Sequence, residues 1–114
     1  MRWSFYTLPV KKVILDENVP RPLRNLLAGH AVTTVQKEGW AGIGNGELIA
    51  NIDGVFDVFV TSDKNLRYQQ NLKDRKIAII ELPFNAFDLV LPLAPMILAA
   101  INDSQPNDYL TIEP

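Results

Sequence analysis

The 114-residue sequence contains no cysteine and a single histidine, His30. Without cysteine the chain can form no disulfide and can hold no metal through thiolates, and one imidazole cannot build a histidine zinc site. A metal site in this chain would therefore use oxygen ligands, which magnesium and manganese prefer. Hydrophobic residues make up 47% of the sequence and charged residues 21%, as in an ordinary globular protein.

No apolar run in the sequence is long enough to cross a membrane. The longest, Leu89–Ile101, has 13 residues and two prolines, whereas a spanning helix needs about 20 residues. The apolar stretch after Arg2 is too short for a signal-peptide core. We therefore expect a soluble, cytoplasmic protein without membrane contact. It would consist of one domain, residues 11–114, preceded by residues 1–10 as a leader or an extra strand.

The charge is unevenly distributed along the chain. All eleven Lys and Arg residues lie at or before Lys76, together with eight acidic residues, so residues 1–76 carry a charge of +3. The remaining 38 residues contain five acidic residues and no Lys or Arg, which gives −5. This asymmetry indicates either a basic working face within a chain of net charge −2 or a chance distribution.

Short apolar runs alternate with helical patterns along the chain. Val13–Leu15 and Phe56–Thr61 show no alternation of apolar and polar residues. Such continuous apolar runs are typical of strands buried on both faces of a parallel sheet. The other expected strands are Ala31–Val35, Ile77–Leu82 and Tyr109–Ile112. Helices are expected from Pro20 to a stop at Gly29, over Glu47–Ile52 with a cap at Asn45 or Gly46, over Leu66–Leu72 and over Pro92–Ile101. The alternation predicts an α/β fold with a parallel sheet and right-handed crossovers.

Acidic residues follow two of the expected strands. Asp16 and Glu17 come directly after Val13–Leu15, and Asp63 follows Phe56–Thr61. The ends of successive parallel strands meet at one edge of the sheet, where α/β proteins bind ligands. Glu47 can point to the same edge from the start of its helix. Three converging carboxylates repel one another unless a divalent cation lies between them, and such a cation can support phosphodiester hydrolysis.

Each of these acids also has a purely structural interpretation. Asp63 precedes a predicted helix and can serve as its N-cap, and carboxylates near helix starts are common. Glu47 alone carries little information for the same reason. Asp16 is harder to explain by capping, because Glu17 places a second charge beside it.

The ordered segments LDENVPRPLRNLL, GNGELI and FVTSDKNL resemble the PIN-like family of small bacterial proteins. The resemblance extends from Lys12 to about Ile112, with the DEN, NGE and T-x-D-x-x-L elements in order. It implies a three-layer α/β/α sandwich with a mainly parallel central sheet. It also implies an Mg²⁺- or Mn²⁺-dependent endoribonuclease, similar to the toxin of a toxin–antitoxin pair, with RNA as substrate and a helix-turn-helix antitoxin as partner.

The resemblance also implies roles for individual residues. Asp16, Glu47 and Asp63 match the metal-binding catalytic acids, and Thr61 matches a threonine that supports the site through a hydrogen bond. Larger members of the family have a fourth acid after the next strand, for which Glu81 or Glu17 are candidates. With three acids assigned, the number of metal ions stays open.

Basic, amide and aromatic side chains surround the predicted site in the sequence. Lys64 and Arg67 are candidates for phosphate contacts, and Asn18 and Asn65 for orienting water or substrate. Lys73, Arg75 and Lys76 form either part of the same basic surface or a solvated face. Trp40 and Tyr68 either stack on bases or anchor loops. His30 lies away from the predicted edge, and we expect it to be structural.

Three other functional classes are alternatives to the ribonuclease. A PIN-like module that binds RNA or protein without cleavage would keep the same fold. A phosphoacceptor receiver domain needs a lysine after its last core strand, and no lysine follows Lys76. A phosphatase with a D-x-D motif is disfavoured because position 18 is Asn18.

The run Leu89–Ile101 has no polar residue, and a helix that is apolar on every side must be covered on every side. Ile97, Leu98 and Ile101 have the spacing to pack on the sheet. Leu91, Leu93 and Met96 are then the expected contacts with another chain, as a homodimer or with the antitoxin. The alternative is that Met1–Leu8 covers the helix.

Overall fold

A computed structural model describes residues 9–69 and 72–114. Its five strands form one sheet in the order β2–β1–β3–β4–β5, and all neighbouring strands are parallel. The strands are β1 (Lys12–Leu15), β2 (Ala31–Thr34), β3 (Val58–Thr61), β4 (Ala78–Glu81) and β5 (Tyr109–Thr111). The predicted α/β fold with a parallel sheet is confirmed. Residues 1–8 of the expected leader lie outside the described part of the chain.

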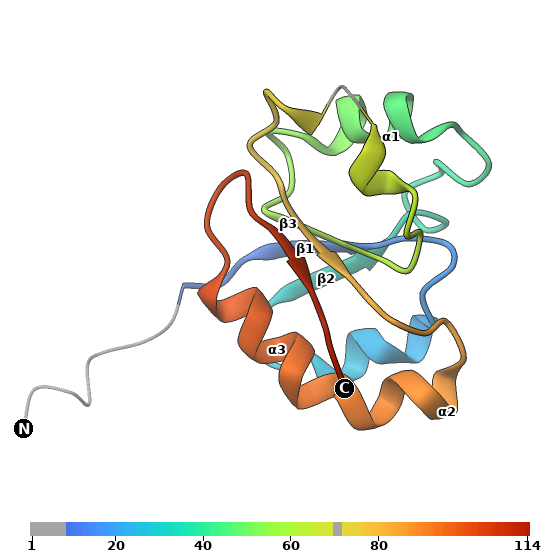
Figure 1. Ribbon diagram of the computed structural model, residues 1–114, viewed down its shortest axis with the longest axis vertical. Coiled ribbons are helices and arrows are strands. Elements are labelled where there is room, and N and C mark those ends of the chain that lie inside the picture. Colours follow the sequence, from blue (N-terminus) through green and yellow to red (C-terminus); the bar gives the residue numbers. More distant parts are fainter. Residues whose placement is uncertain (1–8, 70–71) are drawn as a thin grey trace, which may run out of the picture.

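Helices cover both faces of this sheet. The connections contain η2 (Arg21–Leu26), α1 (Asn45–Ile52), η3 (Leu66–Tyr68), α2 (Phe87–Val90), η5 (Leu91–Leu93) and α3 (Ala94–Asp103), of which the η elements are 3₁₀ helices. α1 lies on one side of the sheet, and α2 and α3 lie on the other (Figure 1). None of the helices in the described ranges is both long enough and apolar enough to cross a membrane.

The strands β1, β3 and β4 contain continuous apolar runs because each face of the sheet has its own core. Ile14 of β1 packs in a cluster with Phe59, Ile79 and the buried residues of α1. Its neighbours Val13 and Leu15 point to the opposite face, where the cluster includes Ile97 and Ile101 of α3. Alternate residues of one strand therefore enter different cores.

Two helical segments differ from the sequence-based expectation. The predicted helix Leu66–Leu72 is wrong: η3 ends at Tyr68, because Gln69 adopts an extended backbone with φ −77° and ψ 130°. The segment after Pro20 is a six-residue 3₁₀ helix, with Pro22 in its first turn. Leu26, the last residue of this helix, is exposed.

The first helix also begins earlier than expected. Gly44, and not Asn45 or Gly46, is the N-cap residue of α1, with an extended backbone at φ −69° and ψ 157°. Asn45 therefore becomes the first helical residue, and its side chain is free to reach a different partner. The helix ends as predicted before Gly54, whose φ of +81° is the left-handed conformation that glycine adopts without strain.

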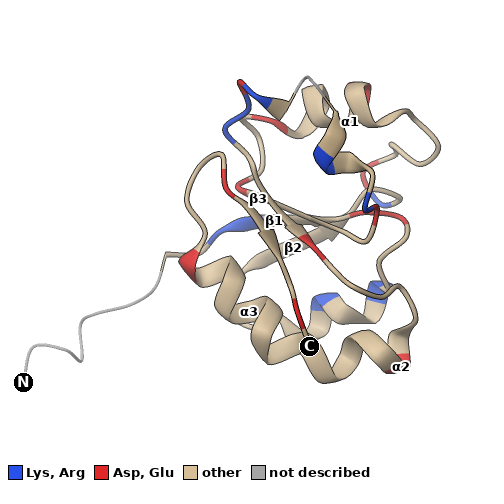
Figure 2. Cartoon of the chain, in the orientation of Figure 1, with Lys and Arg blue, Asp and Glu red and all other residues tan. Residues whose placement is uncertain are grey.

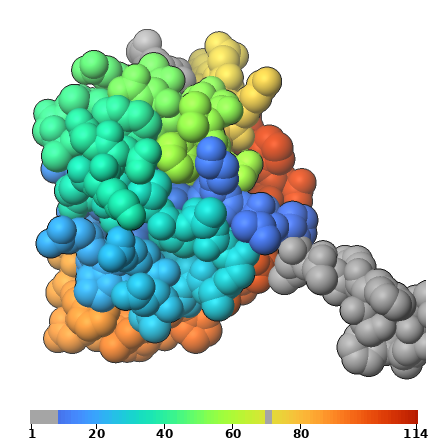
Figure 3. All heavy atoms as spheres, turned by 180° about the vertical axis from the view of Figure 1, so that it is seen from behind, coloured from blue at the N-terminus to red at the C-terminus, as the bar shows by residue number. Residues whose placement is uncertain are grey.

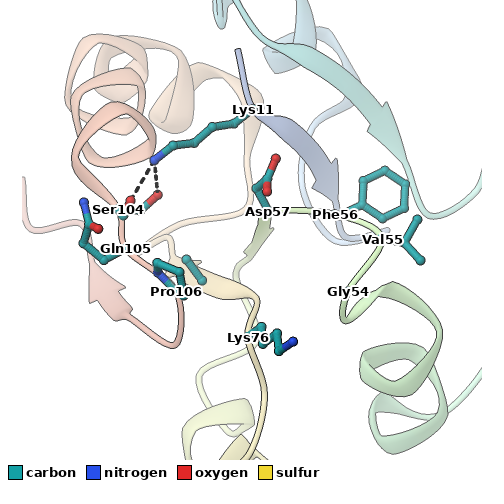
Figure 4. Close-up of a pocket in the computed structure, with 10 residues that line it drawn as sticks. Lys11, Gly54, Val55, Phe56, Asp57, Lys76, Ser104, Gln105 and Pro106 are labelled. Carbon is teal, nitrogen blue, oxygen red and sulfur yellow. Dashed lines mark hydrogen bonds between the residues drawn. The ribbon is translucent and has the colours of Figure 1, made fainter. Parts of the chain in front are cut away.

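The amino-terminal edge of the sheet is fastened by polar contacts. Lys11 Nζ donates hydrogen bonds to the carbonyl oxygens of Ile101 and Ser104 at 2.7 Å each, and so neutralises the carboxyl end of α3. His30 Nδ1 accepts the Lys11 N–H at 3.0 Å, and its other ring nitrogen lies 2.7 Å from Asn102 Oδ1. His30 is structural, as expected. A cavity of about 320 Å³ opens beside Lys11 at this edge (Figure 4).

Candidate functional site

Asp16 and Asp63 meet at the carboxyl edge of the sheet through Thr61, the last residue of β3. The Thr61 hydroxyl donates to Asp16 Oδ2 at 2.7 Å, and its oxygen accepts the backbone N–H of Asp63 at 3.0 Å. The strand register produces this geometry, because Leu15 pairs with Val60 and the following residues, Asp16 and Thr61, are then neighbours. Thr61 has no exposed surface. The two strand ends are thus joined by one buried side chain.

The Asp16 carboxylate is buried and accepts three hydrogen bonds. Besides Thr61, the Glu17 N–H donates to Oδ1 at 2.8 Å and Asn18 Nδ2 donates to Oδ2 at 3.4 Å. Burial raises the pKa of Asp16, the hydrogen bonds from Thr61 and Glu17 lower it, and the charges of Glu17 and Asp63 raise it again. The net direction is upward. A nearby cation would stabilise the ionised form of this carboxylate.

Asp63 is held in a turn that opens η3. Its Oδ1 accepts the Asn65 N–H at 2.9 Å, and its Oδ2 accepts Asn45 Nδ2 at 2.9 Å. The first bond closes a local turn. Asp63 is not the helix N-cap that the sequence left open as an alternative, because the N-cap residue of η3 is Asn65 and no side chain caps this helix. The second links Asp63 to the first residue of α1. Asp63 is only half-buried, so its free lone pairs remain accessible.

Glu47 forms no hydrogen bond with the residues that hold Asp16 and Asp63. It is exposed in the first turn of α1 and forms no side-chain hydrogen bond with any described residue. In residues 9–69 and 72–114, no group of three His, Asp or Glu side chains is close enough to share a metal ion. Asn45, two residues earlier, is the α1 residue that contacts Asp63.

Glu81 is buried at the end of β4 and is fully engaged. Arg67 forms a bidentate ion pair with it, at 2.9 Å to Oε1 and 2.8 Å to Oε2, and Tyr109 donates its hydroxyl to Oε1 at 2.9 Å. Burial and the bond to Glu81 raise the pKa of Tyr109. Arg67, expected to contact substrate, therefore binds the protein's own carboxylate.

Asn18 and Glu17 fasten neighbouring loops to the end of β1. Asn18 Oδ1 accepts the Ser62 N–H at 3.0 Å and joins the β1 and β3 ends a second time. Glu17 Oε1 accepts the Gly42 N–H at 2.9 Å and holds the glycine-rich loop. Trp40 of that loop packs edge-on against Phe56 with a centroid distance of 6.4 Å, which makes it a loop anchor. Tyr68, in contrast, is exposed.

The basic residues divide into structural and exposed ones. Arg75 is buried, donates to the carbonyl oxygens of Leu72 and Asp108, and has a pKa lowered by desolvation. Lys64, Lys73 and Lys76 are exposed. α2 and α3 carry no basic residue (Figure 2). Asn65 contributes its backbone N–H, and not its side chain, to the hydrogen bonds of Asp63.

The apolar residues between Phe84 and Ile101 are partly buried and partly exposed. Ile97 and Ile101 are buried against the sheet and Leu98 is partly buried, as predicted. Leu93 was expected at an interface, but it is only 7% exposed because it points into the core. Leu91 and Met96 are exposed, together with Phe84, Phe87 and Leu89.

The donor set of Asp16 and Asp63 suits a hard divalent cation. An ionised carboxylate offers about four lone-pair positions. Asp16 accepts three hydrogen bonds and Asp63 two among the described residues, so both retain acceptor positions. Magnesium is commonly held by one or two carboxylates with water completing its shell. The two aspartates therefore fit such an ion, without requiring Glu47.

Sequence reasoning did not identify Asn45 or Tyr109 as parts of this region. Asn45 belongs to the same NGE segment as Glu47. The sequence therefore indicated the correct segment, but it predicted Glu47 and not Asn45 as the residue near the aspartates. Tyr109 is separated from Glu81 by 28 residues, and no local pattern connects them.

Comparisons with protein-family models, with curated proteins and with solved structures find no match for this chain.

Proposed function

We propose that this protein is a PIN-like, metal-dependent endoribonuclease with a three-layer α/β/α architecture, and that it acts as the toxin of a toxin–antitoxin pair. The observation that carries the proposal is the joining of Asp16 and Asp63 through Thr61 at the carboxyl edge of a parallel sheet. The ordered sequence elements around Asp16, Glu47 and Asp63 support it. The proposed partner is a small helix-turn-helix antitoxin.

Each residue of the proposed site has a separate role. Asp16 and Asp63 would hold Mg²⁺ or Mn²⁺. The bound ion would polarise a phosphoryl oxygen of the substrate and lower the pKa of a bound water molecule. Thr61 positions Asp16, and Asn45 and the Asn65 N–H position Asp63. In this proposal Glu47, which is exposed on the first turn of α1, orients a water molecule. Lys64, next to Asp63, is placed to contact a phosphate.

Manganese titration by calorimetry tests the metal site. Wild type should bind Mn²⁺, and Asp16→Asn and Asp63→Asn should each lose most of that binding and all metal-dependent cleavage of RNA. The matched control is Asp103→Asn, which removes an exposed acid from the end of α3 and should change neither property. Equal binding by wild type and both site variants would remove these aspartates from the metal site.

A non-cutting PIN-like binding module is the second candidate. It is favoured by the arrangement of the acids, because Glu47 has no contact with the aspartates and Glu81 is occupied by Arg67. For this candidate, Mn²⁺ would bind but no RNA would be hydrolysed. A purified protein that binds Mn²⁺ and RNA and leaves every RNA intact would decide in its favour.

A further inference from the structure

A groove runs across the carboxyl ends of four adjacent strands, on the side of η2 and α2. It consists of three depressions of about 520, 500 and 300 Å³. Arg21 and Gln36 line both the first and the second, and Asn85 lines both the second and the third. Because they share lining residues, the three depressions are adjacent, and together they are called the groove here. The first depression lies after β2, the second beside the end of β1, and the third after β3 and β4.

The ends of this groove are basic. Arg21, Arg24 and Lys37 line the first depression, which contains no acidic residue, and Lys64 lines the third. All four side chains are exposed and form no ion pair among the described residues. Arg67 and Lys11, in contrast, are committed to contacts that hold the fold together. The groove therefore holds four cations that folding leaves unused, whereas the exposed Lys73 and Lys76 lie outside it.

The only acid that lines the groove is already engaged. Glu17 lines the middle depression, and its Oε1 accepts the Gly42 N–H at 2.9 Å. Asn18 lines the same depression and also hydrogen-bonds to Asp16. The groove thus passes directly beside the residues that hold the candidate site. An anionic ligand lying in it would meet cations at both ends and the Asp16 loop between them.

Two aromatic rings stand between the basic ends. Phe87 lines the middle depression and is 42% exposed, and Phe84 lines the third and is 37% exposed. Two exposed rings in one groove form an apolar surface of the kind found in ligand-binding grooves. Cations that follow a backbone, combined with rings on which successive bases stack, are the elements of single-strand recognition. An acidic peptide would use the cations but not the rings.

We infer that this groove binds a short stretch of single-stranded nucleic acid, with phosphates on Arg21, Arg24, Lys37 and Lys64 and bases stacked on Phe84 and Phe87. Under the proposed function, on which the identity of the ligand as RNA rests, the groove delivers the strand to the Asp16–Asp63 edge. Figure 3 shows η2, in light blue, on this face between the glycine-rich loop and α2. Neighbouring strands lie about 4.8 Å apart, so a groove that crosses four of them has room for several nucleotides.

The test measures binding of fluorescent oligouridylate and oligothymidylate of about twelve nucleotides to the full chain in metal-free buffer, where no cleavage occurs. The groove variant is Arg24→Gln with Lys37→Gln. The matched control is Lys73→Gln with Lys76→Gln, which removes the same charge from exposed residues outside the groove. We expect the groove variant to bind at least about tenfold more weakly. We also expect it to reduce the slope of log K against log salt by about 1.4, because each phosphate contact on a single strand contributes roughly 0.7. The control should stay within about twofold of wild type.

The aromatic contribution is measured separately. Phe87→Ala should weaken binding by about tenfold, and Phe87→Tyr should restore it, because the stacking surface returns with the ring. Oligoglutamate of equal charge should not displace the oligonucleotide. Equal losses in the groove and control variants, displacement by oligoglutamate, or absence of binding to either oligonucleotide would each overturn the inference.

The results also separate this inference from the proposed function. Groove-dependent binding without cleavage in Mn²⁺ would uphold the groove and reject the ribonuclease. Cleavage in Mn²⁺ with an unchanged KM in the groove variant would uphold the ribonuclease and reject the groove.

Discussion

The hydroxyl of Thr61 lies 2.7 Å from Asp16 Oδ2, and the same oxygen receives the backbone N–H of Asp63. This threonine is completely buried and belongs to the central strand β3, so it has little freedom to move. It also keeps the pKa of Asp16 lower than burial alone would set it. Thr61 is therefore a positioning residue for both aspartates.

Replacement of Thr61 by valine should cost about 1–3 kcal/mol in the free energy of unfolding, because a buried carboxylate loses a donor and the Asp63 N–H loses its acceptor. Urea denaturation measures this cost. Thr61→Ser keeps the hydroxyl and should recover most of the stability and of the Mn²⁺ affinity. A valine variant that binds Mn²⁺ as well as wild type would show that Thr61 supports only the fold.

Glu81→Gln should leave Mn²⁺ binding and cleavage within about threefold of wild type, since Arg67 and Tyr109 already occupy the carboxylate oxygens. Asp63→Asn, assayed in parallel, should abolish cleavage. Loss of Mn²⁺ binding in Glu81→Gln would instead identify Glu81 as the fourth acid.

The ion pair itself predicts an order of stabilities. Arg67→Gln should lower Tm more than Glu81→Gln, because it leaves a buried carboxylate with only the Tyr109 hydroxyl as donor. Glu81→Gln leaves Arg67 at a half-exposed position where water can solvate it. The double variant should therefore melt above Arg67→Gln alone. A Tm equal to that of wild type in all three variants would show that the pair contributes nothing to stability.

The sequence was sufficient to place Asp16 and Asp63 at one edge of a parallel sheet. Each aspartate follows a continuous apolar run, and such runs are buried in a parallel sheet whose strand ends coincide. The β1–β3 pairing in the structure agrees with that reasoning. The buried positions of Ile97 and Ile101 followed in the same way from helical spacing.

Interactions between distant residues were beyond sequence reasoning. Arg67 and Glu81 are 14 residues apart, and nothing in the local pattern distinguishes Arg67 from the exposed cations around it. α1 begins at Asn45, two residues before the expected Glu47, because Gly44 adopts the extended backbone of the N-cap residue. Asn45, and not Glu47, therefore contacts Asp63. Leu93 was misplaced because a fully apolar run has no pattern to indicate its buried side.

Lys11→Met should destabilise the fold by about 1–3 kcal/mol, because hydrogen bonds from an ammonium to the carboxyl end of α3 are replaced by a methyl group. Lys73→Met, at an exposed position, is the control and should change the free energy of unfolding little. Urea denaturation of both variants gives the comparison. The same small change in both would mean that water replaces the Lys11 contacts without loss.

The exposed apolar residues Leu89, Leu91 and Met96 predict a homodimer. They belong to the consecutive elements α2, η5 and α3 and are 50, 40 and 42% exposed. Apolar side chains so close in the sequence mark an interaction surface, and two-fold dimers are the commonest soluble assembly. Sedimentation of wild type at micromolar concentration should give a dimer, and Met96→Glu should give a monomer because a buried interface cannot solvate the carboxylate. Gln105→Glu, exposed beyond the end of α3, is the control and should remain dimeric. A monomeric wild type, unchanged by Met96→Glu, would leave this surface to the proposed antitoxin.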